Sequence, residues 1–222
     1  MLEIKTISLG GVNCYLLKAE TGYVLVDTGF ASRRAGLEKW LEAEGCRPGG
    51  LKLIVLTHGD TDHAGNAAFL REKFGAAIAM HRGDVAMAGQ GDMAANRKAR
   101  PDRVSPVFRL LMWLGPVLFP PGRFEKFRPD ILVEDGQGLS GFGIDAEVVS
   151  IPGHSKGSIG VLTAEGDLFC GDLLANFGKP GFHMLIDDLT AARSSVERLK
   201  KLGVKTVYPG HGKPFRIERL KV

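Results

Sequence analysis

The stretch Leu53-Ile54-Val55-Leu56-Thr57-His58-Gly59-Asp60-Thr61-Asp62-His63-Ala64-Gly65-Asn66 decides the fold of this chain. Its first residues end the apolar run 51–56, which is typical of a short buried strand. The polar loop that follows carries two histidines and two aspartates, and a helix is predicted from this loop to Phe74. Imidazole and carboxylate groups at the end of a buried strand predict a site at one edge of a sheet.

Three further polar side chains follow apolar runs in the same way. Val148 to Gly153 precedes His154, Leu168 to Gly171 precedes Asp172, and Val207 to Gly210 precedes His211. A single such histidine is most often an ordinary loop residue. Four strand ends of this kind are better explained by a shared functional site than by coincidence. Imidazole and carboxylate together suit zinc, iron or manganese, so the pattern indicates a metal site.

The rest of the chain alternates strand and helix patterns. Strands are expected at 4–9, 12–18, 23–27, 51–56, 76–80, 131–133, 146–151, 159–163, 168–170 and 206–208. Helices are expected at 33–44 and 190–202, where apolar residues recur at helical spacing. Each half of the chain therefore gives several strands followed by helix and strand units, which predicts two sheets with helices outside.

Five segments together resemble the signature regions of the metallo-β-lactamase superfamily. They are Val26-Asp27-Thr28-Gly29, residues 57–66, Pro152-Gly153-His154-Ser155, Gly171-Asp172 and Pro209-Gly210-His211-Gly212, and they occur in the family's order. The resemblance implies one domain over residues 1–222. Its expected fold is a four-layer αββα sandwich of two mixed β-sheets flanked by helices, with a binuclear metal site between the sheet edges.

The resemblance also implies a role for each motif residue. His58 and His154 would hold the first metal; Asp62, His63 and His211 would hold the second; Asp172 would bridge the two. Asp27 would be a buried residue that orients the motif loop. Asp62 is also the candidate catalytic residue, which would orient the attacking water or accept its proton.

One position departs from the family pattern. The usual motif is His-x-His-x-Asp-His, and Asp60 stands where the second histidine is expected. We expect Asp60 to act as a ligand, with a solvent-facing loop aspartate as the alternative. Two zinc ions are the first expectation. Because the oxygen donor of Asp60 favours harder ions, manganese and iron stay open, and so does a mononuclear site.

The function implied is that of a metal-dependent hydrolase, in which a metal-bound hydroxide attacks a small ester, thioester or lactone. Two alternatives remain. One is a phosphodiesterase or nuclease, although the additional domains of those branches are not seen in this sequence. The other is di-iron redox chemistry of the flavodiiron type, which would need a separate electron donor.

Residues 92–129 interrupt the pattern and are expected to form a helical insertion or lid. They carry a net charge of +5, whereas the rest of the chain carries −1. The apolar part, 107–119, predicts a helical hairpin. This hairpin packs on the core, roofs the site or contacts a second subunit, and shallow contact with a membrane is the least favoured alternative. A cationic rim favours anionic substrates, and an apolar roof over the site favours partly apolar ones. Lys179, Phe182 and His183, in a glycine-rich loop, are the candidate substrate contacts.

Composition and charge indicate which partners and which cellular location to expect. The chain has 222 residues, 44% of them hydrophobic and 24% charged, with a net charge of +4. Since the positive charge is confined to the insertion, we expect no nucleic-acid partner. Three cysteines without paired spacing favour a reducing compartment, and no leader or membrane span is recognised, so a cytoplasmic location is predicted. A homodimer stays open.

Overall fold

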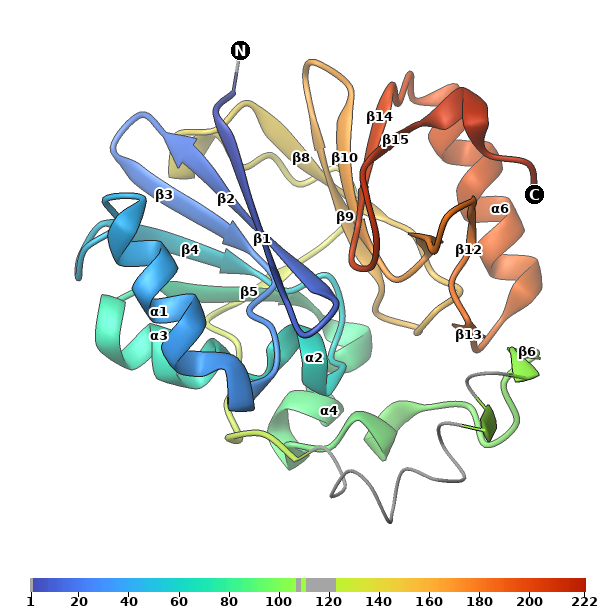
Figure 1. Ribbon diagram of the computed structural model, residues 1–222, viewed down its shortest axis with the longest axis horizontal. Helices are drawn as coiled ribbons and strands as arrows, with labels where there is room; N and C mark the ends of the chain where they lie inside the picture. The colour runs from blue at the N-terminus through green and yellow to red at the C-terminus, as the bar shows by residue number, and fades with distance from the viewer. Residues whose placement is uncertain (1, 107–108, 111–122) are drawn as a thin grey trace.

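The computed structural model describes residues 2–106, 109–110 and 123–222. Two mixed β-sheets lie face to face, with helices on the outer side of each (Figure 1). The expected αββα sandwich is thus confirmed. The helical hairpin expected over residues 107–119 lies almost wholly outside the described residues.

The first sheet has six strands in the order β1-β2-β3-β4-β5-β7. The first three are antiparallel neighbours, and the pairs β3-β4, β4-β5 and β5-β7 are parallel. The strands span β1 Ile4–Leu9, β2 Val12–Ala19, β3 Gly22–Val26, β4 Leu51–Val55, β5 Ala77–His81 and β7 Ile131–Val133.

The second sheet has five strands in the order β15-β14-β10-β9-β8. Only the central pair β10-β14 is parallel. The strands span β8 Ala146–Ser150, β9 Ile159–Thr163, β10 Asp167–Gly171, β14 Thr206–Pro209 and β15 Phe215–Arg216. Two small ladders pair β11 Leu174–Asn176 with β12 Pro180–Phe182, and β6 Arg103–Val104 with β13 Leu185–Ile186. β15 and these short strands have no clear sequence pattern and were not expected.

Helices α1 Arg34–Ala43 and α3 Ala67–Phe74 cover the first sheet, and α6 Leu189–Lys201 covers the second. Strand alternation divides the apolar side chains into layers. On β4, Ile54 packs toward Leu37 and Leu70 of the helices, whereas its neighbour Leu53 packs between the two sheets with Val161. A third apolar cluster lies between the second sheet and α6.

The helix predicted from the motif loop to Phe74 is interrupted. α2 spans Thr61–Ala64, and α3 begins only after Gly65 and Asn66. Gly65 lies so close to the loop after β3 that a Cβ there would be 2.5 Å from the carbonyl oxygen of Gly29. The Asn66 side chain donates to the carbonyl of Thr28 at 2.7 Å. Contacts with that loop therefore break the helical pattern.

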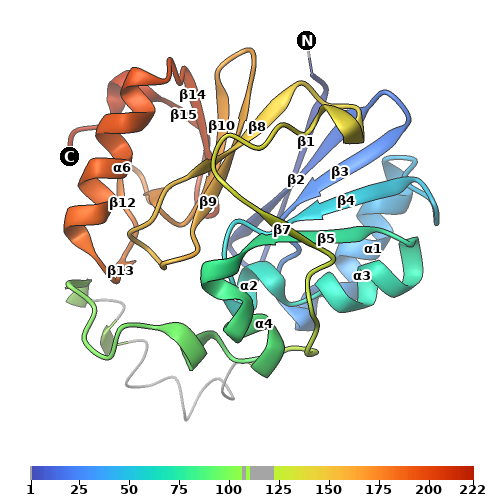
Figure 2. The same cartoon turned by 180° about the vertical axis from the view of Figure 1, so that it is seen from behind.

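The described part of the expected insertion is only slightly helical. After α4 (Val85–Gln90) the chain forms a 3₁₀ turn, Met93–Asn96, and then runs as an extended arm below both halves (Figure 2). The arm ends in β6, which pairs with β13 of the second half. It thus carries residues of the first half to the opposite side of the sandwich.

Candidate metal centre

The motif loop begins where β4 ends, and Asp27 at the end of β3 holds it in place. The Asp27 carboxylate accepts hydrogen bonds from the Thr57 amide, the Thr57 hydroxyl and Nδ1 of His63, each at 2.8 Å. Because a carboxylate only accepts, Nδ1 of His63 carries the proton, and Nε2 keeps its lone pair for the interior. Asp27 therefore fixes the tautomer of His63.

His58 is fixed by the same chain of hydrogen bonds. The Thr57 hydroxyl donates to Asp27, so it accepts from Nδ1 of His58 at 2.9 Å. The lone pair of His58 Nε2 then also faces the interior. Both Nε2 atoms are buried without a hydrogen-bond partner among the described residues. Buried polar atoms are nearly always paired, so these two nitrogens fit an ion as their partner.

Asp172, which follows β10, is the centre of the cluster. Its Oδ1 lies 3.4 Å from Nε2 of His63, and its Oδ2 lies 3.3 Å from Nε2 of His211 and 3.5 Å from Nε2 of His183. Asp62 Oδ2 also lies 3.3 Å from Nε2 of His211. Carboxylate and imidazole donors from both sheets thus meet at one edge of the sandwich.

Three groups of donor atoms within 4.8 Å of one another could each hold a metal ion. They are Asp62, His63, Asp172 and His211; His58, Asp60 and His154; and His154, Asp172 and His183. The structure therefore brings together all seven residues expected as ligands. Asp172 belongs to two of the groups, but not to the group of His58, Asp60 and His154.

Electrostatics in the cluster favour a cation. Burial by itself would raise the pKa of Asp172, but His183, His211 and His63 hold that pKa well below its usual range. Burial would lower the pKa of His211, but the Asp172 carboxylate raises it to about 10. Asp172, Asp27 and Asp62 likewise raise the pKa of His63 despite its burial. The carboxylates thus favour positive charge on the neighbouring imidazoles. A bound metal ion would supply this positive charge in place of protons.

Arg97, on the arm after α4, is a member of the site that sequence reasoning missed. Its guanidinium forms an ion pair with Asp60, and its side chain is only 10% exposed. Burial would raise the pKa of Asp60, but Arg97 and His58 hold it well below its usual range. The sequence showed Arg97 only as one of eight basic residues in the insertion, with no spacing to single it out.

Asp84 is a second residue that the sequence did not reveal. It is fully buried, and it accepts hydrogen bonds from the Gly59 amide at 3.1 Å, the Ser155 hydroxyl at 2.6 Å and the Gly157 amide at 2.9 Å. Gly59 lies in the motif loop of the first half, and the other two donors lie beside His154 of the second half. Asp84 therefore ties together the two loops that carry the donors of one cluster.

The three expected substrate contacts have different surroundings. His183 is buried and its ring stacks on His211, with ring centroids 5.1 Å apart. Phe182 packs against the apolar cluster under α6, and Lys179 is exposed. Phe177 of the same loop was not singled out, yet its 56%-exposed ring lies 6.1 Å from His183 and 6.0 Å from His211. Phe177 is thus an apolar side chain at the mouth of the cluster.

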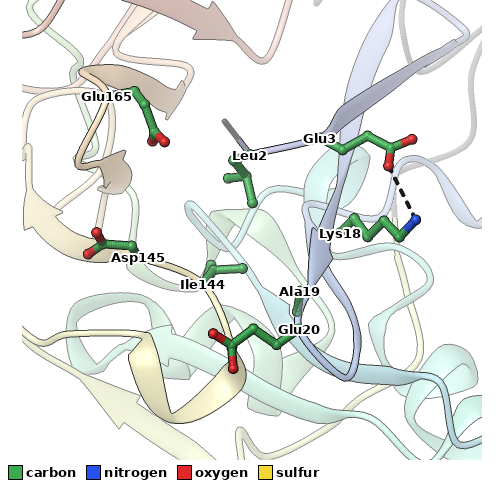
Figure 3. A pocket seen from close by; sticks show the side chains of 9 residues that line it. Leu2, Glu3, Lys18, Ala19, Glu20, Ile144, Asp145 and Glu165 are labelled. Atoms are coloured by element: carbon green, nitrogen blue, oxygen red, sulfur yellow. Dashed lines mark ion pairs between the residues drawn. The ribbon is translucent and has the colours of Figure 1, made fainter.

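Two surface cavities have similar volumes but different positions. The first, of about 500 Å³, lies at the opposite end of the strands and contains none of the expected ligands (Figure 3). Its charged side chains are mainly acidic, and Glu3 pairs there with Lys18 at 3.4 Å. The second, of about 490 Å³, is lined by Arg97, Lys98, Lys156 and Asp187 among others. It also contains none of the expected ligands, but Arg97 on its wall contacts Asp60 and His154. The second cavity is therefore connected to the cluster through Arg97, whereas the first is not.

Comparison with known proteins agrees with this geometry. Residues 7–211 match the sequence profile of the metallo-β-lactamase superfamily. The chain belongs to that superfamily. Members of this superfamily typically bind two metal ions. No helix among the described residues combines the length and the apolar character that crossing a membrane requires.

Two relatives and one solved structure illustrate the range of the superfamily. Metallo-β-lactamase domain-containing protein 1 of Rattus norvegicus is 29% identical over 95% of this chain and 69% of its own length. Acyl-coenzyme A thioesterase MBLAC2 of Gallus gallus is 26% identical over 94% of this chain and 75% of its own. The structure of the BLEG-1 B3 metallo-β-lactamase has a TM-score of 0.74 at 24% identity, covering 98% of this chain and 95% of that one, which shows the shared fold.

Proposed function

We propose that this chain is a metal-dependent hydrolase of small acyl compounds, with a thioester as the favoured substrate and simple esters and lactones as related ones. The observation that carries the proposal is the group Asp62, His63, Asp172 and His211, in which His63 and Asp172 are buried and the other two are half-buried. These residues would hold a divalent ion, which would supply Lewis acidity toward a carbonyl oxygen and a water molecule. The similarity to an acyl-coenzyme A thioesterase supports the thioester within this class.

The chain's own residues would divide the remaining work. Asp62 is the most solvent-accessible carboxylate of the group, at 18% exposure of its side chain, and it is paired with His211. This exposure supports a role for Asp62 as the group that accepts a proton from water at the cluster and returns it to the leaving group. Asp27 and Thr57 keep His63 and His58 in the tautomers that a metal requires.

Two features near the cluster support an anionic, partly apolar substrate. The exposed ring of Phe177 offers an apolar surface for an acyl chain beside His183 and His211. The cavity next to Arg97 has Lys98 and Lys156 on its wall, which favour an anionic group on the other part of the substrate. A thioester of a phosphorylated carrier combines both properties.

The test is metal analysis of protein purified without added metal, paired with a panel of a chromogenic ester, a thioester, a lactone and a phosphodiester. We expect bound zinc or manganese and the highest kcat/KM on the acyl substrates. Cleavage of the phosphodiester alone would instead assign the chain to phosphodiester hydrolysis. Two iron ions without hydrolysis of any substrate would contradict the proposal and favour redox chemistry.

Phe177 offers a sharper test of substrate binding. In Phe177→Ala we expect KM for a medium-chain acyl thioester to rise several-fold with kcat nearly unchanged, because the ring contributes apolar contact area and no chemistry. Leu132→Ala is the matched control, since Leu132 is 50% exposed on β7 and belongs to neither the cluster nor its adjoining cavity. An equal rise of KM in both variants would contradict the placement of the acyl group.

A further inference from the structure

Arg97 is held within the metal centre by contacts with two of its donor residues. Nη2 pairs with Oδ2 of Asp60 and lies 2.9 Å from Nε2 of His154. Nη1 donates to the carbonyl oxygen of His154 at 2.6 Å and lies 3.6 Å from Oδ1 of Asp187. The guanidinium thus has defined partners on both terminal nitrogens, in a position that is almost entirely buried.

The tautomer of His154 shows what this contact means for metal binding. Nδ1 of His154 lies 2.8 Å from the carbonyl oxygen of Leu185, which can only accept, so Nδ1 carries the proton. Nε2 is then the acceptor, and it receives the hydrogen bond from Nη2 of Arg97. The lone pair that would bind a metal ion at His154 is therefore already used by the guanidinium.

Arg97 consequently affects two of the three groups of candidate ligands. His154 and Asp60 make up most of one group, and His154 also belongs to the group with Asp172 and His183. Of the three groups among the described residues, only Asp62, His63, Asp172 and His211 forms no ion pair or hydrogen bond with the guanidinium.

The balance of charges in the site also favours a single divalent ion. The site has three carboxylates, Asp60, Asp62 and Asp172, where the usual motif of the superfamily has a histidine in place of Asp60. Arg97 balances Asp60, which leaves two carboxylates to balance one divalent ion. A second divalent ion between His58, Asp60 and His154 would lie against the guanidinium, and repulsion between buried cations is strong.

We propose that this chain holds one metal ion, at Asp62, His63, Asp172 and His211, and that the guanidinium of Arg97 takes the place of the second. Asp60 and Arg97 then act as a pair: the aspartate replaces a histidine ligand, and the arginine replaces the ion that this ligand would bind. Arg97 is a positioning residue for His154 and for the loop of Asp60. This inference rests on the proposed function, because it uses the same metal centre.

The experiment is a metal count on the full chain. Wild type and Arg97→Gln are stripped with a chelator, loaded with excess zinc, desalted and analysed for zinc per chain. We expect one zinc ion for wild type. We expect close to two for Arg97→Gln, because the glutamine has no charge and leaves Asp60 and Nε2 of His154 available.

Two controls separate the role of Arg97 from general effects of charge. Lys98→Ala removes the neighbouring cation, whose side chain is 48% exposed and pairs with Asp102, and it should still hold one zinc ion. Arg97→Gln combined with Asp60→His restores the usual histidine and should hold two zinc ions with greater resistance to chelator than Arg97→Gln alone. If Lys98→Ala gains a second ion, the effect is one of net charge and the inference is wrong.

The wild-type protein tests the inference even if the variants do not fold. In a titration with Mn²⁺, electron paramagnetic resonance should show an isolated ion, and calorimetry with Zn²⁺ should saturate at one ion per chain. A spin-coupled pair or saturation at two ions would overturn the inference and leave the proposed function standing. Binding of no ion at all would overturn the proposed function itself.

Discussion

At the scale of single residues, the centre depends on hydrogen bonds that fix imidazole tautomers before any ion binds. Asp27 serves two donors from Thr57 and one from His63, and it does so from a left-handed backbone conformation with φ of 61°. Non-glycine residues seldom adopt this conformation, and aspartate and asparagine are among those that tolerate it best. The backbone there turns so that one carboxylate reaches both neighbours.

Asp27→Asn tests this arrangement without adding backbone strain. The amide offers one acceptor oxygen, and its NH₂ group would face a donor, so His63 and Thr57 could not both keep their hydrogen bonds. We expect the affinity for zinc to fall by about 10- to 100-fold, as measured by competition with a coloured chelator. Asp130→Asn, at a 42%-exposed carboxylate remote from the cluster, should keep the wild-type affinity.

At the scale of secondary-structure elements, the loops after β3, β4, β10 and β14 must approach one another closely, and glycines make this approach feasible. A Cβ on Gly210 would collide with Oδ1 of Asp172 and lie 2.6 Å from Cε1 of His63. The loop after β14 is further held by Asn13, which donates to the carbonyls of Pro209 and Gly212 at 3.0 and 2.7 Å. Close backbone packing thus sets the spacing between donors.

Gly210→Ala should therefore displace Asp172 and His63. Both neighbours are buried and hydrogen-bonded or paired, so neither can move aside without cost. We expect zinc retention after desalting to drop strongly while the far-ultraviolet circular dichroism stays close to that of wild type. Gly89→Ala, on α4 where a Cβ meets no atom within 4 Å, should retain zinc and gain about 0.5–1 kcal/mol of stability. Full zinc retention by Gly210→Ala would show that this loop can shift.

A second prediction at this scale concerns the attachment of α6. Arg198 on α6 donates from Nη1 and Nη2 to the two oxygens of Asp135, at 2.8 and 2.7 Å. This pairing lowers the pKa of Asp135 below its ordinary 3.8. Because the folded pKa is lowered, the pair stabilises the protein above about pH 3.8, and that stabilisation is lost as the pH falls through the lowered pKa.

Asp135→Asn should consequently destabilise the protein in a pH-dependent manner. The carboxylate is 46% exposed, so solvent screens the pair and we expect a loss of about 0.5–1 kcal/mol at neutral pH. The difference from wild type should shrink toward zero in acid, as measured by urea denaturation at several pH values. A difference that stays constant down to about pH 2 would mean that the charge of Asp135 does not carry the effect.

At the scale of the whole molecule, the centre joins the two halves of the sandwich. His58, Asp62 and His63 come from the loop after β4, whereas Asp172 and His211 follow β10 and β14 of the other sheet. The arm that carries Arg97 crosses between the halves, and β6 pairs with β13 on the far side (Figures 1 and 2). An ion at this position links parts of the chain that are more than a hundred residues apart.

Removal of the metal should lower the stability of the entire fold. An ion that binds the folded chain at about 1,000 times its Kd stabilises it by about 4 kcal/mol. We expect a chelator to lower Tm by several degrees and excess zinc to restore it, as measured by scanning calorimetry. Asp172→Ala, which lacks the carboxylate that touches His63 and His211, should show nearly the same Tm with and without chelator. A Tm that is unaffected by chelator in wild type would contradict this linkage.

The sequence by itself determined the layers of the fold and indicated most of the candidate donors. Strand ends followed by His58, His154, Asp172 and His211 are local patterns, and parallel strands necessarily bring such ends to one edge of a sheet. Strand boundaries agreed with the structure to within one or two residues, because alternation and apolar runs depend on near neighbours. His183 was predicted only as a substrate contact, and its place in a group of candidate ligands became visible in the structure.

Only the tertiary structure decided which charges meet the donors. Arg97 lies on an arm without helical or strand periodicity, and its pairing with Asp60 depends on how that arm crosses between the halves. Asp84 joins two loops in the same way, and Phe182 turns toward the core whereas Phe177 lies at the mouth of the cluster. Periodicity reports the face on which a residue lies, but a contact between distant segments depends on the packing of the whole chain. The sequence therefore predicted a metal centre, and the fold placed an arginine inside it.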